Sequence, residues 1–302
     1  MRFEVQNFTA SDGTQLGYVE AGSGRPLFYL MGFGEDREAA HRCFEKWSDS
    51  FHCYCFDYRG YGSSELSEDA GVERAARDLH ELLEYLRLAD VALVGYSMGG
   101  SIAFSYARQF GTQYLERLVL VDTAPKLINE DDWRVGLWQG RYVRSDFERD
   151  LQVILDDPSL FQLSFYVRAA TKTRYAVDNV VFPEYNDRDA WLSRAVEVTG
   201  VKLPLIKRIF TFTLSDEKKR CVRRYWETMT GGDWRDILGT IDVPTLCLYA
   251  DPGSFYYSAT AEYTASKIPN ATTRAIANAS HTCPKENLAE FVAQIADFCA
   301  RD

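Results

Sequence analysis

Short apolar runs alternate with longer amphipathic segments in the first part of the chain. Segments 37–47 and 72–88 carry apolar residues at the spacing of a helix that packs on one face. The short runs predict strands at 3–9, 15–20, 27–31, 53–57, 91–94 and 118–121. A run such as 91–94, in which every residue is apolar, is typical of a strand buried on both faces of a parallel sheet. This alternation predicts a doubly wound, mostly parallel α/β sheet.

The alternation stops near residue 125 and returns near residue 242. Strands are predicted again at 243–249 and 271–277, with helices at 259–268 and 285–300. The stretch between has helical spacing and no convincing core strand. It holds too many large apolar side chains for a disordered linker, namely Trp133, Trp138, Phe161, Phe165, Tyr166, Trp191, Phe210, Phe212 and Trp226. We therefore predict a core made of residues 1–124 and 242–302, with a mainly helical insertion at 125–241.

The run at 91–94 leads directly into Gly95-Tyr96-Ser97-Met98-Gly99 and then into a segment of helical spacing. Strand, G-x-S-x-G and helix form the context of a nucleophile elbow. The turn is tight, so a side chain at Gly95 or Gly99 would collide with its neighbours. Strain at position 97 pushes the Ser97 hydroxyl outward, above the free N–H groups of the helix start. A glycine-rich turn of a nucleotide-binding protein is the alternative, but no G-x-G-x-x-G or G-K-[ST] accompanies it.

Charge and cysteine content narrow the class of protein. The formal net charge is -10, from 34 basic and 44 acidic residues, which argues against nucleic acid or an anionic membrane as partner. No run of about 18 apolar residues predicts a membrane span, and the first residues lack a signal-peptide core. Cys53 and Cys55 share one face of a strand and so indicate packing. Without a pair of C-x-x-C units or a His/Cys cluster we expect no structural zinc site and no other metal site. We expect a soluble, cytoplasmic protein.

A serine nucleophile needs a base, and the chain has four histidines. His41 and His80 lie in predicted helices, and His52 comes just before a strand. His281 lies in the loop between the last strand and the last helix. In a doubly wound sheet the parallel strands all end at one edge, the carboxyl edge. This loop and Ser97 both lie at that edge. The order of serine first and histidine late also fits a hydrolase triad, so His281 is the candidate base.

Together these motifs resemble the α/β-hydrolase superfamily over residues 3–125 and 240–300. The matching segments are Gly95-Tyr96-Ser97-Met98-Gly99-Gly100, Asp57-x-Arg59-Gly60-x-Gly62-x-Ser64, Val243-Pro244-Thr245-Leu246, and His281 with Glu286-Asn287. The resemblance implies that the insertion is a cap, or lid, over the site. A serine at position 97 resembles esterases, lipases, C–C hydrolases and peptidases. It argues against haloalkane dehalogenases and epoxide hydrolases, which use aspartate there.

The resemblance also implies an oxyanion hole made by the backbone N–H groups of Phe33 and Met98. Members of the superfamily usually carry His-Gly at the end of the third strand, where this chain has Met31-Gly32. That histidine orients the loop that holds one oxyanion donor. Met31 cannot make the same polar contacts, so other groups must hold this loop.

The acid that would orient His281 has two candidates. The superfamily pattern places it three residues after a glycine that closes the penultimate strand, a position that falls on Gly253 here. Asp251 lies two residues earlier, where a rearranged loop would aim it at His281. Asp122 ends the strand after the serine helix, a site that some members use. Asp251 also fits a simple turn before proline, and aspartate is common at position 122 without being catalytic. Three possibilities therefore stay open for the acid: Asp122, Asp251 or neither.

These features predict a cofactor-free serine hydrolase that cleaves an ester or lactone of a small, bulky, apolar molecule through an acyl-enzyme. Its partner would be that small-molecule substrate, and the sequence does not indicate an oligomeric state. A C–C bond hydrolase of a diketone-like substrate is one alternative. A ligand-binding or receptor protein with slow turnover is another, and Met31 and Gly253 favour it.

Overall fold

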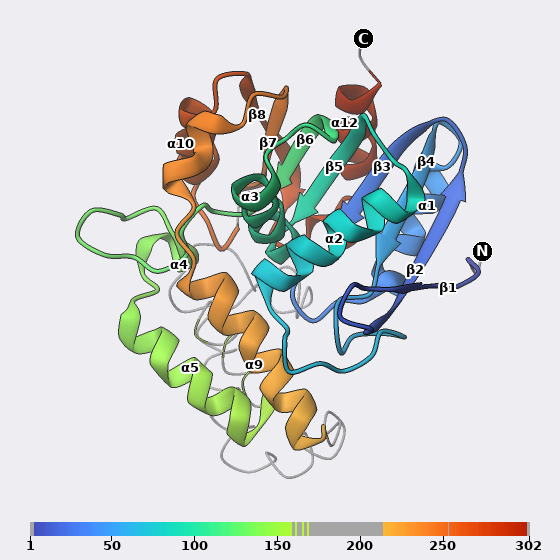
Figure 1. Ribbon diagram of the computed structural model, residues 1–302. Helices are drawn as coiled ribbons and strands as arrows, with labels where there is room; N and C mark the ends of the chain where they lie inside the picture. Colours follow the sequence, from blue (N-terminus) through green and yellow to red (C-terminus); the bar gives the residue numbers. More distant parts are fainter. Residues whose placement is uncertain are drawn as a thin grey trace.

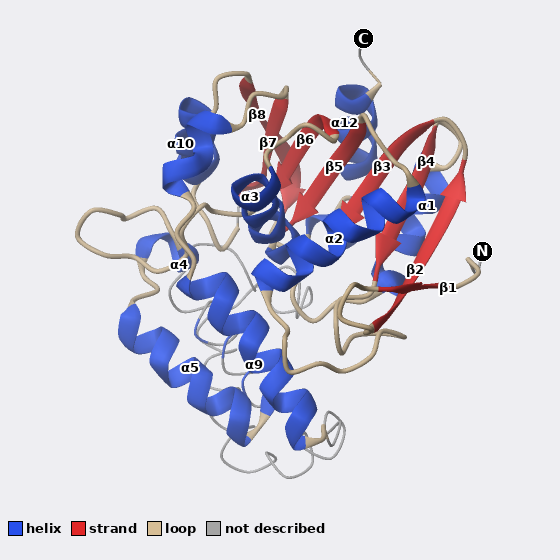
Figure 2. Ribbon diagram, viewed as in Figure 1, coloured by secondary structure: helices blue, strands red, loops and turns tan. Residues whose placement is uncertain are grey.

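A mixed, mostly parallel sheet crosses the molecule (Figures 1 and 2). The computed structural model describes residues 3–158, 161, 165, 168, 214–252 and 254–300. The strands are β1 (Gln6–Thr9), β2 (Gln15–Gly22), β3 (Arg25–Leu30), β4 (Phe51–Phe56), β5 (Val91–Tyr96), β6 (Leu115–Val121), β7 (Thr245–Pro252) and β8 (Ala271–Ala279). In the described residues they form one eight-stranded sheet in the order β1-β2-β4-β3-β5-β6-β7-β8. β2 pairs antiparallel with β1 and β4, and the remaining pairs are parallel.

Helices cover both faces of the sheet, as the alternating pattern predicts. The face with α2 (Val72–Leu86), α3 (Met98–Phe110) and α10 (Ser258–Lys267) buries Phe28 and Leu30 of β3. The opposite face, with α1 (His41–Trp47) and α12 (Leu288–Cys299), buries Leu27 and Tyr29 of the same strand. Successive strand residues point to opposite faces, so an unbroken apolar run serves both layers. The predicted α/β fold class is confirmed.

Two predicted helices are divided in the structure. Residues 37–47 form the 3-10 helix η1 (Arg37–Ala40) followed by α1, and the closing segment forms α11 (Cys283–Glu286) followed by α12. The second break falls at Asn287, whose backbone is not helical, at φ -131 and ψ 60. Its side chain accepts a hydrogen bond from the Glu290 backbone N–H, at 3.4 Å, and so caps the start of α12.

The described part of the chain between β6 and β7 consists of helices joined by irregular segments. It contains α4 (Leu137–Gly140), α5 (Arg144–Asp156), α9 (Asp216–Gly231) and the 3-10 helix η2 (Arg235–Thr240). α5 and α9 lie side by side beyond the end of the sheet (Figure 1). Aromatic side chains of this segment join the same buried cluster as α2 and α3. Tyr166, Trp191, Phe210 and Phe212 lie outside the described residues, and the boundaries at 124 and 242 stay a prediction.

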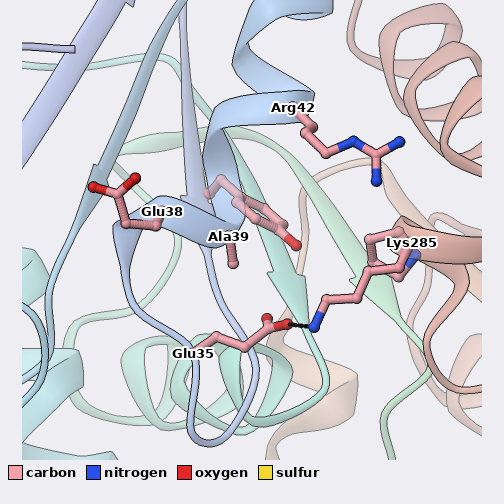
Figure 3. A pocket seen from close by; sticks show the side chains of 7 residues that line it. Glu35, Glu38, Ala39, Arg42 and Lys285 are labelled. Carbon is pink, nitrogen blue, oxygen red and sulfur yellow. Dashed lines mark ion pairs between the residues drawn. The ribbon is translucent and has the colours of Figure 1, made fainter. Parts of the chain in front are cut away.

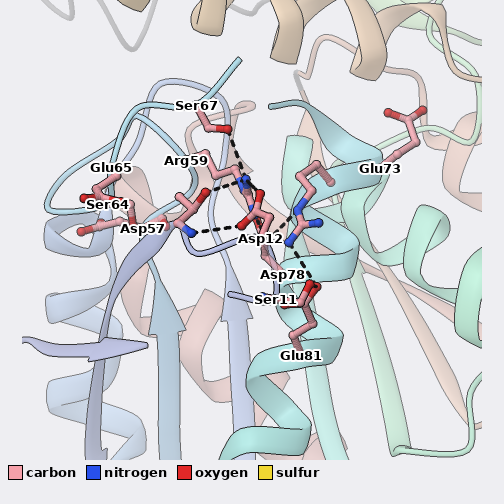
Figure 4. A network of polar contacts seen from close by, with 12 residues as sticks. Ser11, Asp12, Asp57, Arg59, Ser64, Glu65, Ser67, Glu73, Asp78 and Glu81 are labelled. Atoms are coloured by element: carbon pink, nitrogen blue, oxygen red, sulfur yellow. Dashed lines mark hydrogen bonds and ion pairs between the residues drawn. The ribbon is translucent and has the colours of Figure 1, made fainter. Parts of the chain in front are cut away.

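A buried arginine anchors the polar loop after β4 (Figure 4). Arg59 forms a two-pronged pair with Asp78 of α2, with Nε–Oδ2 and Nη2–Oδ1 distances of 2.8 Å. It also donates to Asp12 at 2.5 and 3.1 Å in the turn between β1 and β2. Its hydrogen bonds lower the pKa of Asp12, whereas burial raises the pKa of Asp78. Removing one member of such a buried network costs about 3–5 kcal/mol of stability. The Asp-x-Arg-Gly motif therefore holds together the loop after β4, helix α2 and the turn between β1 and β2.

The seven cysteines are all buried and free. Cys53 and Cys55 lie on the face of β4 that packs against α1 and α12, as their spacing predicts. Burial raises the pKa of the Cys53 thiol to about 12. These side chains therefore act as small apolar groups in the core.

Candidate active site

Ser97 lies in the turn between β5 and α3, in a backbone conformation with φ 52 and ψ -115. Residues other than glycine rarely adopt a positive φ, and the strain is typical of functional sites. Two glycines allow the turn to form. A Cβ at Gly95 would lie 2.6 Å from the Gly99 carbonyl oxygen, and one at Gly99 would lie 2.2 Å from that of Leu30 in β3. The close approach of α3 to β3 therefore requires glycine at position 99.

The His281 side chain lies between Ser97 and Asp122. Its Nε2 is 3.0 Å from the Ser97 Oγ, and its Nδ1 is 2.6 Å from the Asp122 Oδ2. His281 follows β8 and Asp122 follows β6, so two loops at the carboxyl edge supply the pair. Both side chains are buried, and Ser97 is half-buried. With a proton on Nδ1, the ring donates to Asp122 and leaves Nε2 free to accept the proton of the serine hydroxyl.

Further donors surround the Asp122 carboxylate. The Ser254 hydroxyl donates to Oδ2, and the Ala250 backbone N–H lies 3.5 Å from Oδ1. Ser254 is itself held, because its Oγ accepts the Tyr256 backbone N–H at 3.0 Å. Burial and the neighbouring Asp122 raise the pKa of Tyr256, so its hydroxyl stays protonated. The carboxylate of Asp122 is thus desolvated and also well supplied with hydrogen bonds.

Asp251 occupies a different position from Asp122. Strand β7 continues to Pro252, beyond the predicted end at residue 249, so Asp251 lies within the strand and pairs with Ala277 of β8. Its side chain is exposed, and within the described residues it makes no hydrogen bond to His281. Gly253, the other position considered for the acid, lies outside the described residues. Of the two candidate acids, the geometry brings Asp122 to the histidine.

Three residues that the sequence does not single out contact His281 or Asp122. Phe255 stacks on the imidazole with ring centroids 4.4 Å apart. The Tyr96 hydroxyl donates to the His281 carbonyl oxygen at 2.8 Å, and Ser254 donates to Asp122. Tyr96 is the variable residue of the elbow, so its position was a usable signal. Ser254 and Phe255 became recognisable only once the end of β7 was known.

The two predicted oxyanion donors lie at the end of β3 and at the start of α3. Met98 is the first residue of α3, and its N–H belongs to the free donors of a helix start. Phe33 follows β3 and is half-buried. Neither N–H donates a hydrogen bond within the described part of the chain. Both are therefore available to a negatively charged oxygen above Ser97, and a role in an oxyanion hole stays a prediction.

Met31 is fully buried in the apolar layer beneath this loop. The Tyr58 hydroxyl donates to its backbone carbonyl at 2.9 Å, and the Glu35 carboxylate accepts the Gly32 N–H at 3.2 Å. The loop is therefore held by neighbours, while the side chain at position 31 packs among apolar groups.

Aromatic residues of the insertion contact both sides of the site. Trp226 of α9 lies 5.2 Å from Phe33, measured between ring centroids, and Phe161 lies 6.3 Å from it. On the histidine side, Phe165 lies 5.4 Å from Phe255. Phe161 and Trp226 also contact each other, at 4.9 Å. These five rings, which we call the aromatic cluster, run from the loop after β3 to the ring stacked on His281.

The start of the insertion also reaches the segment that supports Asp122. Gln139, in α4, has a left-handed backbone with φ 52. Its backbone N–H donates to the Phe255 carbonyl at 2.7 Å, and its side-chain amide donates to the Ser254 carbonyl at 3.1 Å. The insertion is therefore tied directly to the two residues beside His281 and Asp122.

Over the residues described here, no group of three or more His, Cys, Asp and Glu side chains is arranged to hold a metal ion. No described helix has the length and apolar character needed to cross a membrane.

Comparisons with known proteins agree on one family. Residues 25–287 match the sequence profile of the family described as alpha/beta hydrolase fold. A protein from Synechocystis sp., provisionally named a non-heme chloroperoxidase, is 26% identical over 255 residues, which are 83% of this chain and 81% of that protein.

Solved structures resemble almost the whole chain. An esterase from Exiguobacterium antarcticum has a TM-score of 0.76 at 19% identity, and the match covers 98% of this chain and 99% of the esterase. The enol-lactonase from Burkholderia xenovorans LB400 has a TM-score of 0.67 at 20% identity, over 98% of this chain and 100% of the lactonase. At these identities the resemblance shows the fold.

Proposed function

The chain belongs to the alpha/beta hydrolase fold family, and on that premise we propose that it is a serine hydrolase that cleaves an ester or a lactone without a cofactor. The contact chain from the Ser97 Oγ through His281 to Asp122 carries the proposal, with distances of 3.0 and 2.6 Å. A serine hydroxyl is a weak nucleophile until an adjacent base takes its proton. His281 is that base, and Asp122 is the acid that orients it.

In the first half-reaction the Ser97 Oγ attacks the carbonyl carbon while His281 Nε2 takes the hydroxyl proton. The carbonyl electron pair moves onto its oxygen, which accepts hydrogen bonds from the N–H groups of Phe33 and Met98. The intermediate then collapses, the bond to the leaving oxygen breaks, and His281 returns its proton to that oxygen. The acyl group remains on Ser97, and Asp122 stabilises the charged imidazole during both transfers.

In the second half-reaction water takes the place of the departed alcohol. His281 removes a proton from the water as its oxygen attacks the acyl carbon, and the same two N–H groups stabilise the oxyanion. The bond to Ser97 breaks, the serine recovers its proton from His281, and the carboxylic acid leaves. For a lactone, the alcohol and the acid are the two ends of one opened molecule.

The aromatic cluster supports a bulky, apolar substrate. Phe33 lies in the loop after β3 and Phe255 stacks on His281, while Phe161 and Trp226 of the insertion contact Phe33. Ligand sites are lined mainly by apolar and aromatic side chains, with a few polar groups that orient the reacting bond. We propose that the insertion acts as a lid that places these rings over Ser97.

Steady-state hydrolysis of a substrate panel tests this function. The panel contains lactones, a diketone and pairs of chromogenic esters, and each pair consists of an aryl ester and an acetyl ester. Repeated turnover of an ester or lactone is the expected result, and Ser97→Ala should lower it by at least about 1,000-fold. Ser101→Ala is the matched control, because this buried serine of α3 lies one helical turn away. Release of at most one equivalent per chain would indicate a receptor, and turnover of the diketone alone would indicate a C–C hydrolase.

A further inference from the structure

Glu35 closes the loop that follows β3. Its Oε2 accepts the Gly32 backbone N–H at 3.2 Å, and its own N–H donates to the Gly32 carbonyl at 3.3 Å. Phe33 and Gly34 therefore lie inside a turn that one side chain and one backbone bond hold shut. Gly34 has a left-handed backbone, with φ 79, so the turn contains a residue of high conformational freedom.

The other oxygen of the same carboxylate faces the histidine segment. Glu35 Oε1 lies 3.0 Å from the Lys285 Nζ, in α11. Figure 3 shows these two side chains turned toward each other, while Glu38 points away from them. Lys285 lies four residues after His281 in the chain. One carboxylate thus connects the loop that carries Phe33 to the segment that carries the proposed base.

We infer that Glu35 is a positioning residue for the oxyanion donor of Phe33, an inference that rests on the proposed function. The Gly32 N–H is adjacent to the Phe33 peptide, so the Glu35 bond limits the direction in which the Phe33 N–H points. Met31 contributes no polar side chain to this task. An oxyanion donor stabilises the transition state only when it is aimed in advance, and a displacement of about 1 Å costs about 100-fold in rate.

The two bonds of the Glu35 carboxylate differ in expected importance. Lys285 is 63% exposed, whereas the Glu35 side chain is 16% exposed. Exposed ion pairs contribute little, because solvent screens them and ordering a long side chain costs entropy. The bond to the Gly32 N–H is shielded on the loop side, where a Cβ at Gly32 would already lie 3.0 Å from the Tyr96 ring. The positioning effect therefore belongs mainly to the Gly32 bond.

A surface hollow beside the pair supplies the controls. It has a volume of about 240 Å³ and is lined by Tyr29, Glu35, Glu38, Ala39, Arg42, Pro284 and Lys285 (Figure 3). Glu38 is a nearby carboxylate in η1, the 3-10 helix after this loop, and its Oε2 lies 3.2 Å from the His41 Nδ1. A change there alters the same local charge without touching Gly32.

The test measures kcat, KM and the Ki of a boronic acid on the full chain with the best ester of the panel. The variants are Glu35→Ala, Glu35→Gln, Lys285→Met and Glu38→Gln. Glutamine keeps an oxygen that accepts the Gly32 N–H and removes the ion pair, so it separates the two contacts. A boronic acid forms a tetrahedral adduct on the serine, whose oxygen reports on the oxyanion donors.

Glu35→Ala should lower kcat about 10- to 100-fold and raise the Ki of the boronic acid by a similar factor. KM should change less than about 2-fold. Glu35→Gln should restore kcat to within about 3-fold of the wild type, and Lys285→Met and Glu38→Gln should change it no more than that. If Glu35→Ala does not fold, Glu35→Met replaces it, with folding checked by the midpoint of urea unfolding.

Two results would overturn the inference. One is a kcat and a Ki within about 3-fold of the wild type in Glu35→Ala or Glu35→Met, which lack the acceptor for the Gly32 N–H. The other is an equal loss in Glu38→Gln, which would assign the effect to local charge. Failure of the proposed function looks different, because the wild type would then show no turnover that depends on Ser97.

Discussion

The Oδ2 of Asp122 lies 2.6 Å from the Nδ1 of His281, although 159 positions separate the two residues in the chain. Asp122 follows β6 and His281 follows β8, with β7 between these strands in the sheet. The Asp122 backbone N–H donates to the Leu248 carbonyl of β7 at 2.8 Å, and Ser254 beyond β7 donates to its carboxylate. The strand between the two residues therefore helps to hold the Asp122 carboxylate in place.

The first prediction concerns this acid. Asp122→Asn should lower kcat by about 10,000-fold, because the neutral amide no longer stabilises the imidazolium or favours the tautomer with a proton on Nδ1. Asp251→Asn is the matched control and should stay within about 2-fold of the wild type, because Asp251 is an exposed residue of β7. Steady-state kinetics on both variants decides the matter. The reverse ranking would assign the role to Asp251.

The second prediction concerns Ser254, which donates to Asp122 from beyond β7. A hydrogen bond to a charged group contributes about 1.5–3 kcal/mol. We therefore expect Ser254→Ala to lower kcat at least about 10-fold, since the carboxylate loses a donor and some of its fixed orientation. Ser266→Ala is the control, because Ser266 is exposed and its hydroxyl donates to the Tyr263 carbonyl within the same helix, α10. Equal activity of both variants would show that the Ser254 bond is dispensable.

The third prediction concerns the aromatic cluster. Trp226→Leu should reduce kcat/KM for the aryl ester at least about 10-fold more than for the acetyl ester, because the proposed lid loses a ring that contacts Phe33. Trp133→Phe is the comparison, since Trp133 packs against Tyr263 of α10. The ratio of the two kcat/KM values is the readout. An unchanged ratio in Trp226→Leu would place the substrate away from this cluster.

The fourth prediction concerns stability and pH. The Arg59 hydrogen bonds lower the pKa of Asp12 in the folded state, below the value of about 3.9 for an unfolded chain. A lowered carboxyl pKa favours folding at pH values above the unfolded pKa, and the gain is lost as the pH falls through the folded pKa. Asp12→Asn should therefore have a lower free energy of unfolding than the wild type at pH 6, and the gap should narrow below about pH 4.

Urea unfolding at several pH values measures this gap, with Asp49→Asn as the control for an exposed aspartate outside the Arg59 network. A gap that stays constant from pH 6 to pH 3 would show that the Asp12–Arg59 pair does not govern the acid dependence.

Much of the fold could be predicted from sequence because parallel strands buried on both faces appear as unbroken apolar runs. The elbow was equally clear, since its glycines are required by backbone contacts within a few residues of Ser97 or with the adjacent β3. His281 could be placed at the same edge because few histidines compete for the role. The structure brings its Nε2 to 3.0 Å from the Ser97 Oγ.

The choice of acid could not be made from the sequence, and the reason is the end of one strand. The pattern predicts a strand at 243–249, whereas β7 spans Thr245–Pro252. This shift places Asp251 inside the strand and moves Ser254 and Phe255 to the loop beside His281. Strand ends depend on pairing with the neighbouring strand, here β8, which a local pattern does not contain. The contacts of Trp226 and Gln139 are likewise tertiary and left no sequence signal.

The central claim is that Ser97 is a nucleophile activated by His281, and covalent labelling tests it most directly. The full chain is treated with a fluorophosphonate, and the labelled peptide is identified by mass spectrometry alongside the loss of ester turnover. We predict one label per chain, on Ser97, formed as activity disappears, with no label in Ser97→Ala and labelling at least about 100-fold slower in His281→Ala. A label on another residue, or Ser97→Ala protein that still hydrolyses the ester at the wild-type rate, would contradict the account.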